Sequence, residues 1–126
     1  MVDRNGEHRD LLDLKKRGVL PVTEIVRLHA LAHKLRAVNT DERLKALASE
    51  RHMTIKDSRN LADALHFIQH VRIKHQCEQI VRGEKVSNHL NPKDLPKMAR
   101  EQLRDAFTII DEAQSAVRQT YRAGLG

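Results

Sequence analysis

The sequence predicts an all-α domain, an antiparallel helical bundle of about five helices. Apolar residues recur at helical spacing over two long stretches, residues 55–82 and 96–121. No run alternates strictly between apolar and polar residues over six positions, so nothing indicates a β-sheet. The chain has five glycines, three prolines and 2% aromatic residues. Its core must therefore consist mainly of aliphatic side chains packed between helices.

A chain of 126 residues is expected to form one domain. We expect a flexible N-terminus over residues 1–7 and a single helical domain over residues 8–122. No apolar run approaches the roughly 20 residues of a membrane span, and no signal-peptide core is seen, so we expect no membrane partner. The single cysteine, Cys77, excludes an intramolecular disulfide and fits a cytoplasmic protein.

The first helix is expected over residues 8–17, with Gly18 ending it. Its last turn would hold the basic residues Lys15, Lys16 and Arg17, where cations complement the helix dipole. The alternative is a functional one, in which these three side chains form a cluster that faces phosphate groups.

The next two helices follow closely. Pro21 suits the first turn of a helix whose apolar face extends to about residue 37. Asn39 and Thr40 can cap a shorter helix over residues 41–49.

Clear start and stop signals bound the long helix at residues 55–82. Thr54 and Asp57 resemble a capping box at its start, and Gly83 is expected to close it. Residues 84–93 are expected to form the longest connection, since they contain several turn-forming residues. The last helix should begin near Pro96.

The face that the long helix buries changes along its length. Successive residues are offset by about 100°, so its first half has one apolar stripe: Leu61, Ala64, Leu65, Ile68 and Val71. Continued along the helix, the same side becomes polar: Arg72, His75, Gln79 and, at its edge, Gln76. The apolar residues of the second half lie on roughly the opposite side, which we expect to be buried there: Ile73, Cys77, Ile80 and Val81.

This polar segment is the candidate site. Arginine suits phosphate or acidic surfaces, while histidine and glutamine can read a base or a ribose. In the alternative interpretation, Arg72 and His75 form hydrogen bonds with the loop at residues 88–94 inside the domain, because buried polar groups need partners.

The net charge of +6 favours an anionic partner, a nucleotide or an acidic protein surface. Aromatic side chains that would stack on bases are missing, so we expect no specific nucleic-acid binding. Histidine pairs four residues apart, His29 with His33 and His66 with His70, lack further ligands, so we expect no metal site. Nothing resembles a catalytic triad or a glycine-rich phosphate loop, and we assign no catalytic residue.

Several segments, taken in order, resemble the C-terminal substrate-binding domain of a family of bacterial nucleotidyltransferases. The resemblance covers about nine-tenths of the chain and rests on residues 13–21, 25–31, 40–47, 72–76, 88–95 and 100–114. It places an Arg-x-x-His-Gln signature at Arg72, His75 and Gln76. These three residues are the candidate substrate contacts, with Lys15, Lys16, Arg17 and Asn88 as outer candidates.

In that family this domain usually follows a catalytic domain similar to the uridylyltransferase that modifies the PII signalling protein, often with a CBS pair before it. The resemblance implies a catalytic partner, in the same polypeptide or a separate chain, that holds magnesium and a nucleoside triphosphate. The Gly-Ser turn and paired acidic residues of such a catalytic domain are absent here. We therefore expect no transferase activity from this chain alone.

Three functions remain open. The first is a nucleotidyltransferase accessory domain or subunit that packs beside the catalytic domain and helps to hold nucleotide or acceptor. The second is a protein-docking or regulatory helical module that contacts no substrate. The third is a ribonuclease of the HEPN type, which carries Arg, four to six residues and then His. That spacing occurs three times here, about as often as composition alone gives.

Overall fold

The computed structural model describes residue 2 and residues 10–125, with side chains as far as Tyr121. In this part of the chain the protein is all-α, with one very small two-stranded sheet besides its helices and the loops that join them. The four α-helices are α1 (Leu20–Ala32), α2 (Thr40–Ser49), α3 (Ile55–Val81) and α4 (Lys97–Leu125). None of the described helices is both long and apolar enough to cross a membrane.

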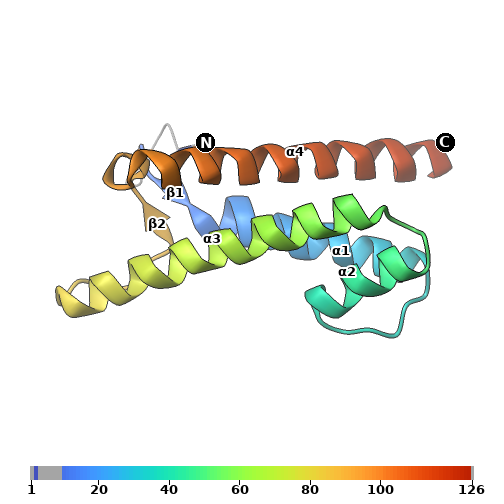
Figure 1. Ribbon diagram of the computed structural model, residues 1–126, viewed down its shortest axis with the longest axis horizontal. Helices are drawn as coiled ribbons and strands as arrows, with labels where there is room; N and C mark the ends of the chain where they lie inside the picture. The colour runs from blue at the N-terminus through green and yellow to red at the C-terminus, as the bar shows by residue number, and fades with distance from the viewer. Residues whose placement is uncertain (1, 3–9, 126) are drawn as a thin grey trace.

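The two long helices, α3 and α4, run antiparallel and make the most extensive helix–helix contact (Figure 1). The shorter helices α1 and α2 pack near the first half of α3. The second half of α3 extends beyond them, and the chain returns from its end to the start of α4 (Figure 1). This returning segment is what positions the candidate site.

The predicted starts of α2 and α3 are confirmed by their caps. Asn39 Oδ1 accepts a hydrogen bond from the backbone N–H of Glu42 at 2.8 Å, and Thr54 Oγ1 accepts one from Asp57 at 3.0 Å. Each satisfies a backbone donor that the first helical turn leaves unpaired. Gly83 closes α3 with a φ of +71°, as expected for the residue that follows a helix.

The core is built as the helical spacing predicts. The apolar stripe in the first half of α3 is buried along its whole length: Leu61, Ala64, Leu65, Ile68 and Val71. It packs in one cluster with the buried side chains of α4: Leu103, Ala106 and Ile110. Buried residues of α1 and α2 complete the cluster, so a single core joins all four helices.

The helix predicted over residues 8–17 is wrong. Residues 3–9 lie outside the described part, as does most of the predicted flexible N-terminus, of which only Val2 is described and packs against the core. Leu12–Asp13 forms strand β1, which pairs antiparallel with β2 (His89–Leu90). A two-residue strand has no periodicity for a sequence to display, and this pairing keeps residues 12–13 extended.

After β1 the chain enters a turn of π-helix, Lys15–Val19, that continues directly into α1. Gly18 therefore ends no helix. It is buried where this turn crosses α3, and a Cβ added to it would lie 2.9 Å from Ile68 Cγ2. The glycine permits this close approach.

Two further expectations are corrected. The helix that begins near Pro21 ends at Ala32 and not near residue 37, because Lys34 adopts a left-handed conformation with φ +56°. The apolar residues in the second half of α3 are exposed and not buried. Cys77 is also exposed. The returning loop packs against the polar side of the helix, so nothing in the described structure covers the apolar side.

Candidate functional site

The polar stripe of α3 binds the returning loop. Arg72 Nε donates a hydrogen bond to Asn88 Oδ1 at 2.7 Å, and Gln76 Nε2 donates to the same oxygen at 3.1 Å. Gln76 Nε2 also lies 3.3 Å from the carbonyl oxygen of Ser87. Both side chains are partly buried. They therefore have partners inside the domain, as the alternative interpretation of this stripe expects.

Gln79 completes this set of contacts, which we call the loop latch: Arg72, Gln76, Gln79, Ser87 and Asn88. The Ser87 backbone N–H donates to Gln79 Oε1 at 2.9 Å, and Gln79 Nε2 donates to Ser87 Oγ at 3.2 Å. Gln79 is only 6% exposed. The latch holds the loop beside α3 and so orders the residues that follow it, including β2.

His75 has contacts on two sides. Its Nε2 lies 2.7 Å from the carbonyl oxygen of His89. A carbonyl oxygen only accepts, so Nε2 carries the proton, and Nδ1 of the neutral ring is an acceptor. The ring also lines a groove between α3 and the segment that leads into α4. His75 thus connects the ordered loop to the groove.

The groove has a volume of about 420 Å³. Its opposite wall is formed by a short 3₁₀ turn, η2 (Pro92–Asp94), and by the first turns of α4. The apolar part of the lining is Phe67, Val71, Leu90, Leu95, Pro96 and Ala99. The polar part is His70, Lys74, His75, Glu78, Arg82, Asp94 and Gln102. An apolar lining with a few polar groups is typical of small-molecule sites.

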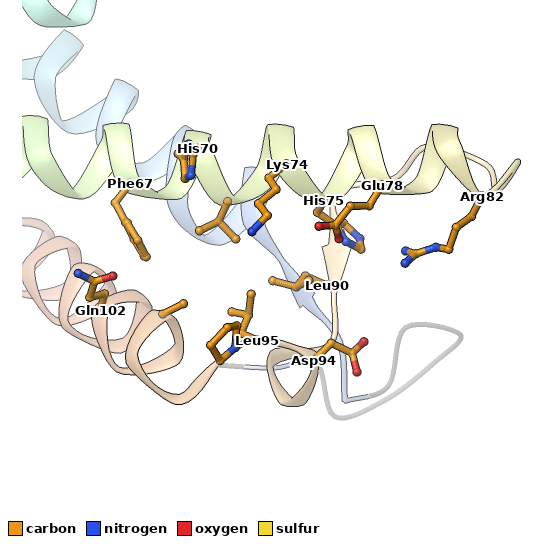
Figure 2. Close-up of a pocket in the computed structure, with 13 residues that line it drawn as sticks. Phe67, His70, Lys74, His75, Glu78, Arg82, Leu90, Asp94, Leu95 and Gln102 are labelled. Atoms are coloured by element: carbon orange, nitrogen blue, oxygen red, sulfur yellow. The ribbon is translucent and has the colours of Figure 1, made fainter.

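The charges of the groove lie on two facing elements (Figure 2). Lys74 and Glu78 extend from α3 and Arg82 from its C-cap, whereas Asp94 lies on the opposite side in η2 (Figure 2). Arg82 also forms an ion pair outside the groove lining, because its Nε donates to Glu84 Oε1 at 2.9 Å. The groove therefore presents two cations, two carboxylates and an apolar wall, and its cations are available to an anionic group of a ligand.

The basic triplet does not line the groove. Lys15, Lys16 and Arg17 are exposed on the π-helical turn that follows β1. The backbone of this region is tied to the latch, because the Leu14 N–H donates to the carbonyl oxygen of Asn88 at 2.9 Å. The triplet is thus anchored beside the returning loop, outside the groove.

A comparison with models of protein families shows the family to which the chain belongs. The family model described as "putative nucleotidyltransferase substrate binding domain" matches residues 1–121. The chain belongs to this family. A search of curated proteins and a search of solved structures each gave no significant match.

Of the predicted site residues, only His75 lines the groove. Arg72, Gln76 and Asn88 belong to the latch. Sequence reasoning missed the main polar row of the groove, which lies on α3 at intervals of four residues: His70, Lys74, Glu78 and Arg82. That spacing places side chains on one helical face and was the available signal.

Three of the four histidines predicted not to bind metal, His29, His33 and His66, have partners among the described residues. His66 Nε2 lies 2.9 Å from Asp41 Oδ1, and His33 stacks on His52 with ring centroids 3.7 Å apart. Tyr121 Oη lies 3.0 Å from His29 Nδ1. Nowhere in the described structure do three His, Cys, Asp or Glu side chains gather so that they could hold a metal ion.

The His29 site lies beside a second cavity of about 360 Å³ between α1, α3 and α4. Burial lowers the pKa of His29 from its ordinary 6.5, and the nearby His33 lowers it further. Burial also raises the pKa of Tyr121. With His29 neutral and its proton on Nε2, the Tyr121 hydroxyl donates to Nδ1 and links α4 to α1.

Proposed function

We propose that this domain helps a nucleotidyltransferase to hold its nucleotide or acceptor, and that the groove beside α3 is where it does so. The observation that carries the proposal is a groove, in a member of this family, that brings His75 together with Lys74 and Arg82. Its volume of about 420 Å³ is within the usual range for small-molecule sites.

The lining supports a nucleotide in particular. The apolar wall suits a base, and Lys74 and Arg82 suit phosphate oxygens. The Nδ1 acceptor of His75 suits a ribose hydroxyl or an exocyclic amine. The latch residues Arg72 and Gln76 then act as positioning residues, because they order the loop whose His89 carbonyl holds the His75 ring.

The remaining candidates have outer roles in this proposal. Asn88 accepts hydrogen bonds from both latch side chains and so shapes the loop. Lys15, Lys16 and Arg17 are exposed near that loop and provide positive charge for an acidic partner or a distal phosphate. Magnesium and the reacting triphosphate belong to the catalytic domain, which is expected to resemble the PII uridylyltransferase. That domain would supply the metal chemistry of nucleotidyl transfer.

The test is calorimetric titration of this chain with ATP, UTP and CTP, with and without magnesium. We expect one of these nucleotides to bind and Lys74→Ala to weaken its binding about tenfold, since one phosphate contact is lost. Lys56→Ala is the matched control, because Lys56 is exposed on the same helix and does not line the groove. Equal effects of the two substitutions would overturn the assignment of the groove.

The alternatives give different results. A protein-docking module would bind none of the three nucleotides and would still associate with a separate transferase. A HEPN-type ribonuclease would cleave RNA, and His33→Ala would abolish the cleavage. Either result would replace the proposed function.

A further inference from the structure

The second half of α3 carries four exposed apolar side chains on one side of the helix. Ile73 is 59% exposed, Ile80 64% and Val81 86%, and Cys77 between them is also exposed. We call these four residues the exposed α3 face. Single exposed apolar residues are common on protein surfaces, whereas a contiguous patch of a few hundred Å² is often a functional one.

The rest of this helix half is occupied. The latch and His75 bind the returning loop on one side, and the polar row of the groove lies on another. The exposed α3 face lies on the part of α3 that projects beyond α1 and α2 (Figure 1). A partner could therefore reach it without displacing any described element.

The exposed α3 face borders the groove. At about 100° per residue, Val81 lies only about 20° around the helix from Lys74, and Cys77 lies about 60° from it. Lys74 lines the groove. A partner bound to the exposed α3 face would therefore sit at the edge of the groove and could reach a ligand held there.

The size of the face distinguishes between possible partners. An exposed aliphatic side chain offers roughly 100 Å² for burial, so the three aliphatic residues together offer roughly 300 Å², and the smaller Cys77 adds a little to this area. A stable protein dimer buries about 800 Å² on each partner. Interfaces between domains start near 600 Å² in total, or about 300 Å² per side. The face thus fits a domain held nearby better than a second copy of this chain.

We infer that the exposed α3 face docks the nucleotidyltransferase catalytic domain through an apolar surface of that domain, which brings the active site to the edge of the groove. The inference rests on the proposed function, since a domain that holds substrate for a transferase must place it against the catalytic domain. The transferase side of the contact would be apolar where it covers Ile73, Cys77 and Ile80, with polar groups facing Lys74.

Cys77 allows a direct test because it is the only cysteine of the chain and lies within the face. The rate of maleimide labelling at Cys77 is followed by mass spectrometry of its peptide. It is measured with and without the purified nucleotidyltransferase catalytic domain of the same organism. We expect the catalytic domain to slow labelling at least tenfold.

A matched pair of substitutions tests the face without the label. Ile73→Glu places a charge in the proposed contact and should weaken association with the catalytic domain at least tenfold. Ile55→Glu is the control, because Ile55 is 62% exposed on the same helix and lies at its other end. It should leave the association unchanged. Nucleotide binding by the isolated chain should be unaffected by either substitution.

Three results would overturn the inference: no association with the catalytic domain, association without protection of Cys77, or equal effects of the two substitutions. Protection of Cys77 in the chain alone, increasing with concentration, would identify a second copy as the occupant and overturn it too. Failure of the proposed function would look different. The isolated chain would then bind none of the nucleotides, while Cys77 would still be protected by the catalytic domain.

Discussion

Replacing Gln79 by methionine removes the most buried contact of the loop latch and leaves side-chain length nearly unchanged. Gln79 is 6% exposed, and it both accepts from the Ser87 N–H and donates to the Ser87 hydroxyl. Methionine can do neither. The Ser87 N–H then loses its partner, and the loop that carries β2 is held to α3 only by the remaining latch contacts.

The expected loss can be worked from these two hydrogen bonds. A neutral hydrogen bond contributes about 1 kcal/mol net, so two contribute about 2 kcal/mol to the free energy of unfolding. Partial desolvation of the unpaired Ser87 N–H adds to this loss, and burial of the methionine sulfur and methyl group offsets it. For a chain of this length, about 2 kcal/mol corresponds to a melting temperature lower by roughly 8 °C.

Urea unfolding monitored by circular dichroism measures the change, with Gln119→Met as the control. Gln119 is an exposed glutamine on α4, outside the latch, and its substitution should change stability by less than about 0.5 kcal/mol. If Gln79→Met unfolded at the wild-type urea concentration, the latch would not stabilise the domain. The polar stripe of α3 would then need another explanation, with ligand contact the first to consider.

Three further predictions concern the fold. Gly18→Ala should lower the free energy of unfolding, measured in urea, by about 1 kcal/mol. The added methyl group overpacks against buried Ile68, and this cost outweighs the better helix propensity of alanine. An increase in the free energy of unfolding would show that the contact is easily relieved. Arg51→Gly should raise the melting temperature by a few degrees, equivalent to about 0.5 kcal/mol, since Arg51 has a φ of +62°; an unchanged or lower value would contradict this. His29 has a pKa below 6.5 in the folded state, so its contribution to stability is full above about pH 6.5 and is lost as the pH falls through the folded pKa. Unfolding measured from about pH 7 to about pH 5 should show a loss that is smaller in His29→Gln, and equal losses would exclude His29 as its source.

Local signals predicted most of the helices well. The Asn39 and Thr54 caps mark the starts of α2 and α3, and the apolar stripe of α3 from Leu61 to Val71 is buried as its spacing indicates. The N-terminal segment was the main failure. Leu12 and Asp13 are extended because they pair with β2, almost 80 residues away in the chain. No local sequence pattern indicates such a pairing.

Of the residues predicted for the candidate site, the structure brings only His75 into the groove, and their role in binding substrate stays a prediction. The Arg-x-x-His-Gln segment does lie where the groove and the returning loop meet α3. Within it, Arg72 and Gln76 bind the loop, whereas His75 also reaches the groove. Contact with a substrate and contact with the domain's own loop were both predicted from the sequence. The residue types do not distinguish the two, because the same donors suit a backbone carbonyl, an amide or a phosphate.

Periodicity and composition were thus enough to identify an all-α domain, the starts of its main helices and the residues that share each helical face. The ordered segments were enough to indicate the family. Which face of the second half of α3 would be covered depended on the returning loop, since that loop could pack against either the polar or the apolar side. It binds the polar side through hydrogen bonds and leaves Ile73, Cys77, Ile80 and Val81 exposed. A helix shows in its sequence which side chains lie together, while their burial depends on segments that come close only in the folded chain.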